Sequence, residues 1–135
     1  MHQLVYISTS RSEISPDLLR EILAVSQRNN ARVGVTGLLV CGGNRFLQVL
    51  EGPVAAVCDT YERIQQDQRH FATVVLTSRS VSARAFGEWS MAFKEGPRAS
   101  DGTLSEIIFG VTEKLSDPGL QAEFRGFAEI HSQRA

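Results

Sequence analysis

The sequence GVTGLLVCGGNRFLQVLEG, residues 34–52, contains the pattern on which the fold prediction depends. It holds two apolar runs, residues 34–41 and 45–51, which are short and rich in residue types that favour strands. Between the runs lie Gly42, Gly43 and Asn44, which tolerate the positive φ angles of a tight turn. We therefore predict a β-hairpin over this stretch.

Helices are predicted on both sides of the hairpin. Upstream, Ser15 and Pro16 form a helix start, and apolar residues follow at helical spacing to about Asn29. Downstream, residues 54–66 carry an apolar stripe that recurs every three or four positions, at Val54, Val57, Tyr61 and Ile64. The hairpin is thus expected to lie between two amphipathic helices.

Three further apolar runs complete the pattern, over residues 4–8, 71–76 and 86–93. Their short length and their β-branched or aromatic content favour strands. The predicted order is βαββαββ, an α/β (α+β) fold of the ferredoxin-like type, with two helices on one face of the sheet.

A polar, small-residue stretch from Glu95 to Gly102 reads as a linker, so we expect a domain over residues 1–96 and an extension over residues 97–135. Two amphipathic helices are predicted in this extension, over residues 104–115 and after Pro118. Their apolar faces must be covered by the sheet, by each other or by a partner chain. A homo-oligomer is expected, although a monomer with docked helices satisfies the same sequence.

Composition restricts the class of protein. The chain has 135 residues, a net charge of -1 and a pI near 6.3, which argues against binding to nucleic acid or to an anionic membrane surface. It has no apolar run approaching the roughly 20 residues of a membrane span, and Cys41 and Cys58 lack the spacing of a disulfide framework. We expect a cytoplasmic protein.

Catalytic motifs are scarce. His2, His70 and His131 are scattered without zinc spacing or an adjacent nucleophile, so no metal site is predicted. The glycine-containing segments 34–37 and 42–44 do not have the spacing of a phosphate-binding loop. An enzyme is therefore not expected.

Several polar residues do not fit a plain core. Gln48 lies in an apolar strand, where an unpartnered amide costs about 1 to 3 kcal/mol, and Tyr6 has the same character. A contact between them across neighbouring strands would satisfy both, as would backbone or water. Of Asn29 and Asn30, one would cap the first helix and leave the other for a ligand.

Five separated motifs, in this order, resemble one known family. They are LVYIS (residues 4–8), Asn29-Asn30 followed by GVTGLL (34–39), FLQVLEG (46–52), DQRH (67–70) and WSM (89–91). Together they resemble the BLUF family, over roughly residues 2–95. BLUF domains are blue-light sensors that bind FAD. The resemblance implies a ferredoxin-like fold with the isoalloxazine ring between the two helices, against the sheet.

The resemblance also implies roles for single residues. Tyr6 matches the tyrosine that donates an electron and then a proton to the excited flavin, and Gln48 matches the glutamine whose hydrogen bonds rearrange. Asn30 matches the asparagine that holds the ring. The other residues expected near the ring edge or the ribityl chain are Asn29, Arg63, Asp67, Arg69 and His70. Those expected to relay the signal to the far face of the sheet are Trp89 and Met91.

The implied function is a blue-light receptor with a reversible red-shifted state, whose signal passes to a separate partner protein. The ring and ribityl contacts leave FMN and riboflavin open beside FAD. A ferredoxin-like interaction module without flavin is the main alternative. A small acyl-phosphate hydrolase would need a phosphate-cradling loop that the sequence lacks.

Overall fold

The computed structural model describes residues 1–85, 92–94 and 118–132. These residues form one mixed α/β unit around a sheet with the strand order β4-β1-β3-β2-β5. In chain order the elements are β1 (His2–Ser10), α1 (Pro16–Val33), β2 (Thr36–Gly42), β3 (Arg45–Gly52), α2 (Val54–Gln66), β4 (His70–Ser80), β5 (Ala92–Lys94) and α4 (Pro118–Ser132).

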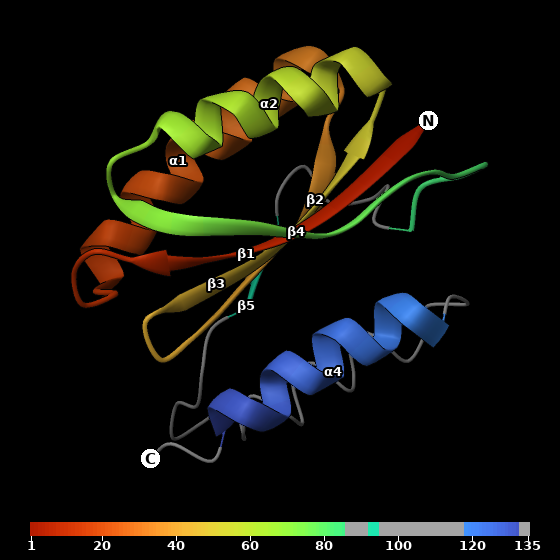
Figure 1. The fold of residues 1–135 in the computed structure, drawn as a ribbon. Helices are drawn as coiled ribbons and strands as arrows, with labels where there is room; N and C mark the ends of the chain where they lie inside the picture. The colour runs from red at the N-terminus through yellow and green to blue at the C-terminus, as the bar shows by residue number, and fades with distance from the viewer. Residues whose placement is uncertain (86–91, 95–117, 133–135) are drawn as a thin grey trace.

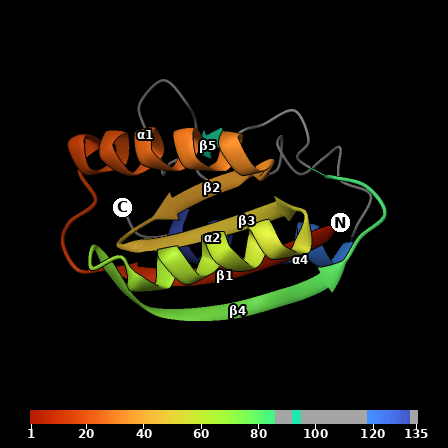
Figure 2. The same ribbon diagram turned by 90° about the horizontal axis from the view of Figure 1, so that it is seen from above.

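The elements are arranged in three layers. Strand β1 pairs antiparallel with β3 and β4, β3 pairs antiparallel with β2, and β5 runs parallel to β2. Helices α1 and α2 lie together on one face of the sheet, and α4 covers the other (Figure 1). Seen from above, β4 forms one edge of the sheet (Figure 2). The predicted ferredoxin-like order, with two helices on one face, is confirmed.

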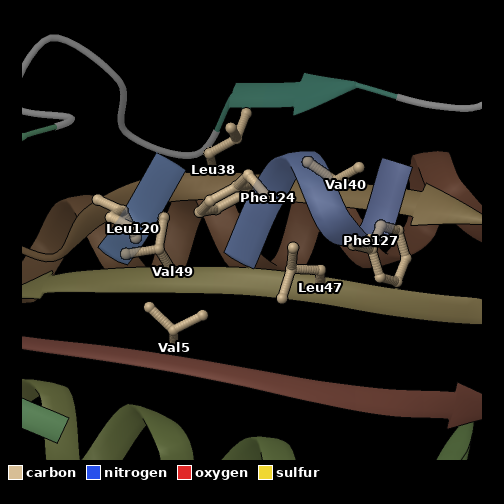
Figure 3. Close-up of a cluster of buried hydrophobic side chains, with 8 residues drawn as sticks. All are labelled: Val5, Leu38, Val40, Leu47, Val49, Leu120, Phe124 and Phe127. Carbon is tan, nitrogen blue, oxygen red and sulfur yellow. The ribbon is translucent and has the colours of Figure 1, made fainter. Parts of the chain in front are cut away.

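Successive side chains of each strand point to opposite faces of the sheet, and each face has its own hydrophobic cluster. The face under α1 and α2 carries Leu4, Tyr6, Leu39 and Leu50 with Val57 of α2. On the opposite face, α4 packs onto β1, β2 and β3 (Figure 3). That second cluster consists of Val5, Leu38, Val40, Leu47, Val49, Leu120, Phe124 and Phe127. Both faces of the three inner strands are therefore buried.

The hairpin and the second helix agree with their predictions. Helix α2 spans Val54–Gln66 as expected, and β2 and β3 are joined by the two residues Gly43 and Asn44, with Gly43 at a φ of 60°. The two-residue loop and the positive φ are those of a tight hairpin turn. Strand β4 is longer than residues 71–76, because it pairs with β1 along nearly the whole of that strand.

The interpretation of Asn29 or Asn30 as a helix cap was wrong. Helix α1 continues to Val33, and Gly34 caps it at a φ of 75°, its N–H bonding to the carbonyl of Asn30. A glycine adopts this left-handed conformation without the steric penalty that an asparagine would incur. Both asparagines therefore lie inside the helix, and their side chains are available to its neighbours.

The C-terminal predictions are tested only in part. The last helix is present as α4, and its apolar residues pack on the sheet of the same chain. The helix predicted over residues 104–115 lies outside the described residues, as do residues 86–91 of the last predicted strand. Among the described helices, none is long and apolar enough to span a membrane.

A buried carboxylate joins the end of β3 to the segment that follows β4. Glu51 is fully buried, and its Oε2 accepts hydrogen bonds from Gln3 Nε2 at 2.8 Å and from the Ala85 N–H at 2.9 Å. Arg84 donates to the carbonyls of Glu51 and Gly34, at 2.9 and 2.7 Å. Residues 84 and 85 are thus held against the strand that carries Gln48.

The close approach of β2 and β3 requires glycine at position 37, where a Cβ atom would overlap the backbone carbonyl of Val49. Gly37→Ala should therefore lower the free energy of unfolding by about 1 to 3 kcal/mol, the usual cost of overpacking. Gly126→Ala in α4, where a Cβ meets nothing within 4 Å, should instead stabilise the chain by about 0.5 to 1 kcal/mol. Urea unfolding measures both, and equal effects would contradict this explanation.

Candidate functional site

A pocket opens between α1 and α2 above the sheet, with about 730 Å³ of space including the solvent at its mouth. Its floor comes from β1, β2 and β3, and its walls come from the two helices. The lining combines aliphatic and aromatic side chains with amides, hydroxyls and charged groups. These residues are Tyr6, Ile22, Val25, Ser26, Asn29, Asn30, Leu39, Phe46, Gln48, Thr60, Arg63, Ile64, Asp67, Arg69 and His70.

The pocket brings together residues that are far apart in the sequence. All eight positions to which the resemblance gave a flavin contact are in its lining: Tyr6, Asn29, Asn30, Gln48, Arg63, Asp67, Arg69 and His70. They come from β1, α1, β3, α2, the turn that follows α2 and the first residue of β4. The two relay positions, Trp89 and Met91, lie outside the described residues.

A hydrogen bond between Tyr6 and Gln48 lies at the floor of the pocket. The antiparallel register of β1 and β3 places the two residues directly opposite each other, so their side chains share a face. Tyr6 Oη donates to Gln48 Oε1, and each residue is only 4% exposed. The predicted contact across neighbouring strands is thereby confirmed.

Burial controls the protonation of the Tyr6 phenol. Removal from water raises the pKa of Tyr6 well above its ordinary value of 10.0, and negative charge raises that pKa further, from Tyr61 where its phenol is ionised and from the carboxylate of Asp67. The ring of Tyr61 lies 5.2 Å from that of Tyr6, centroid to centroid. Tyr6 is consequently a neutral proton donor throughout the physiological pH range.

Helix α1 presents one stripe to the pocket, at Ile22, Val25, Ser26, Asn29 and Asn30. The spacing of three and four residues puts these side chains on one helical face. Asn30 is 2% exposed, and its backbone carbonyl accepts the N–H groups of Gly34 and Val35 at the helix end. The helix end thus anchors the backbone of Asn30, while its amide lines the pocket.

Charged groups meet where α2 ends and β4 begins. Arg69 Nε donates to both carboxylate oxygens of Asp67, at 2.9 and 3.0 Å, and Arg69 Nη1 lies 3.4 Å from Glu21 Oε1 of α1. The hydrogen bonds from Arg69 lower the pKa of Asp67, and the same pair raises the pKa of Arg69. His70 Nε2 contacts the carbonyl of Ile64. This turn therefore connects the two helices beside the pocket.

The lining also includes two polar residues, Ser26 and Thr60, for which neither the sequence pattern nor the family resemblance predicted a role. Thr60 lies on the pocket side of α2, and Ser26 on that of α1. Both interrupt an otherwise apolar stripe at helical spacing, the one signal in the sequence that could have drawn attention to them. The apolar residues Leu39 and Phe46 read as ordinary core residues and gave no such signal.

The residue types in the pocket are those of a site for an organic ligand or cofactor. Apolar side chains with a few convergent amides and hydroxyls are typical of cofactor sites. Across the described ranges, no group of three or more His, Cys, Asp or Glu side chains could hold a metal ion. Cys41 and Cys58 are both free thiols.

Comparison with known proteins identifies the family. The sequence model described as "BLUF: Sensors of blue-light using FAD" matches residues 1–92. The chain belongs to the BLUF family. The description of the family names FAD as the cofactor, and the pocket offers both amides and apolar side chains.

Relatives within the BLUF family differ in length and in named activity. The chain is 36% identical over 65% of its residues to the blue light- and temperature-regulated antirepressor BluF of Escherichia coli K12, but spans only 22% of that protein. It is 35% identical to the photoactivated adenylate cyclase subunit beta of Euglena longa, of which it spans 10%. The dark-state structure of the BLUF protein BlrB matches with a TM-score of 0.72 and 25% identity, over 96% of each chain.

The raised pKa of Tyr6 makes stability depend on pH. The unfolded chain loses this phenolic proton near pH 10 and the folded chain only at higher pH, so the stabilisation is complete below pH 10 and falls above it. Above pH 10, the ionisation of Tyr6 should therefore lower the free energy of unfolding by up to about 1.4 kcal/mol for each pH unit. Denaturant unfolding on both sides of pH 10 measures the slope.

Tyr6→Phe should remove that component of the slope, because no buried phenol remains. Tyr61→Phe should retain it and serves as the matched control, since Tyr61 lies beside Tyr6 and is only partly buried. If wild type and Tyr6→Phe lose stability equally steeply, then Tyr6 is not the group responsible.

Proposed function

We propose that the pocket holds the flavin of a blue-light sensor and that Tyr6 and Gln48 form its switch. The observation that carries the proposal is the buried hydrogen bond from Tyr6 to Gln48 on the pocket floor. Two buried polar side chains that are bonded to each other at the floor of a ligand pocket can change partners together. Such a pair fits a switch better than a plain core, where hydrophobic residues would serve.

Bound flavin supplies absorption of blue light and, once excited, a strong electron acceptor. Tyr6 is the donor in this proposal. A phenol is protonated at neutral pH, and burial raises the pKa of Tyr6 further, so Tyr6 has both an electron and a proton to give. A phenol that has lost an electron is a strong acid, so its proton would follow the electron to the bound flavin, and both would return to Tyr6 once Gln48 has rearranged.

Gln48 responds to the change at Tyr6. In the dark its Oε1 accepts the Tyr6 hydroxyl, and loss of the phenolic proton removes this bond. An amide has a donor end and an acceptor end, so reorientation or tautomerisation changes which of them faces each neighbour. The new hydrogen-bond arrangement is the proposed signalling state, and a stronger bond to the ring carbonyl gives its red shift.

The remaining lining residues are proposed to hold the cofactor. Asn29 and Asn30 supply amides from α1, and Arg63 supplies an exposed cation from α2. Asp67 and Arg69 are fixed by their hydrogen bonds to each other, and His70 by its contact with the carbonyl of Ile64, which supports contacts to the ring edge or the ribityl chain.

The output is proposed to pass to a separate protein, without turnover of a substrate by residues 1–135. The antirepressor and the cyclase subunit share the matched stretch but not their named activity, which supports an output encoded outside that stretch.

We further propose residues 1–96 as the sensor and residues 97–135 as the output and oligomerisation extension. The packing of α4 on the back of the sheet supports transmission of the signal from the sheet to the extension. We propose the cytoplasm as its location.

The light response of the purified chain tests the proposed function. Flavin absorption bands should be present in the dark, and blue light should shift them reversibly to the red by a few nanometres. A shift of this kind is expected when the hydrogen bonds to the flavin ring rearrange. Difference spectra before and after illumination measure this. A colourless chain that takes up no added FAD would instead favour the flavin-free interaction module.

Two substitutions test the switch pair. Tyr6→Phe should retain flavin and lose the stable red-shifted state, since only the electron and proton donor is removed. Gln48→Leu should retain flavin and show no shift, because no amide remains to rearrange. Cys58→Ala, at an exposed position of α2, is the control and should keep the wild-type difference spectrum. A normal photocycle in either switch variant would remove that residue from its role.

A further inference from the structure

One polar group in the pocket wall is buried without a partner. Thr60 is 4% exposed, and its Oγ1 forms no hydrogen bond with any group in the described structure. A helical threonine commonly bonds to the carbonyl four residues earlier, here that of Ala56, and this bond is absent. Buried polar groups are nearly always hydrogen-bonded, so an orphaned hydroxyl in a native pocket needs an explanation.

The position of Thr60 on α2 supplies that explanation. Thr60, Arg63, Ile64 and Asp67 fall at positions i, i+3, i+4 and i+7, and all four line the pocket. Thr60, Arg63 and Ile64 therefore lie on the face of α2 that borders the space between the helices, and Asp67 follows directly after the helix ends. Tyr6 and Gln48 line the same space from the sheet.

We propose that Thr60 is a further flavin-binding residue, whose hydroxyl donates a hydrogen bond to an acceptor atom of the isoalloxazine ring. The ring carries two carbonyl oxygens and ring nitrogens as acceptors but a single N–H donor, so a hydroxyl donor finds a partner more readily. This inference rests on the proposed function, because it requires flavin in the pocket. Binding then relieves a cost that the flavin-free protein bears.

A second orphaned hydroxyl provides a matched control. Ser8 Oγ is also buried without a partner, and Ser8 lies on β1 two residues beyond Tyr6, on the same face of the sheet. Ser8 is not part of the pocket lining. The two hydroxyls thus share burial and lack of partners but differ in access to the ligand.

The test compares Thr60→Val, Thr60→Ser and Ser8→Ala in the full chain loaded with FAD. Dilution of each holoprotein releases flavin, and flavin fluorescence gives the dissociation constant. Thr60→Val should weaken binding roughly three- to tenfold, the effect of one lost hydrogen bond. Thr60→Ser keeps the hydroxyl and should bind like wild type, and Ser8→Ala should also leave the affinity unchanged.

Thermal melting of the flavin-free chains gives an independent readout. Thr60→Val should melt at or above the wild-type temperature, since it removes a buried hydroxyl that has no partner. A lower melting temperature would show that the hydroxyl is bonded within the protein, and would overturn the proposal. Wild-type affinity in Thr60→Val, or an equal loss in Ser8→Ala, would overturn it as well.

These outcomes are distinct from failure of the proposed function. If the wild-type chain takes up no flavin, both the sensor assignment and the role of Thr60 fall together. If wild type binds flavin and Thr60→Val binds it equally well, only the role of Thr60 is lost.

Discussion

The register between β1 and β3 is the constraint on which the site depends. It sets Tyr6 opposite Gln48, so that both side chains point toward α1 and α2. A slip of one residue would set Tyr6 against Leu47 or Val49 and leave Tyr6 and Gln48 on opposite faces of the sheet. Apolar clusters on the two faces prevent such a slip, since Val5 and Val49 pack under α4 while Leu4 and Leu50 pack under the other helices.

Much of this arrangement could be predicted from periodicity. Helix α2 has the predicted bounds, because its apolar residues recur at helical spacing. The buried state of Gln48 and its bond to Tyr6 followed from a polar residue in an apolar strand. Such predictions succeed where a local pattern and the tertiary environment agree.

The rest depended on contacts that no local pattern encodes. Asn29 and Asn30 resembled a helix end, yet the helix ran on until Gly34 could adopt a positive φ. Glu51 appeared as one more strand residue, and its burial is explained by Gln3 and by the backbone of Ala85, far away in the chain. Thr60 stood out only when the pocket around it was known.

The strand order also has a consequence for biosynthesis. Strand β1 leaves the ribosome before the other strands of the sheet, but it pairs with β3 and β4 and not with β2, the next strand along the chain. Such non-local pairing is slow to form, because closing a long loop costs conformational entropy before any stabilising contact between the strands has formed. His70, which lines the pocket, belongs to the last of these strands to be made. A nascent chain therefore offers flavin no finished site until β4 has emerged.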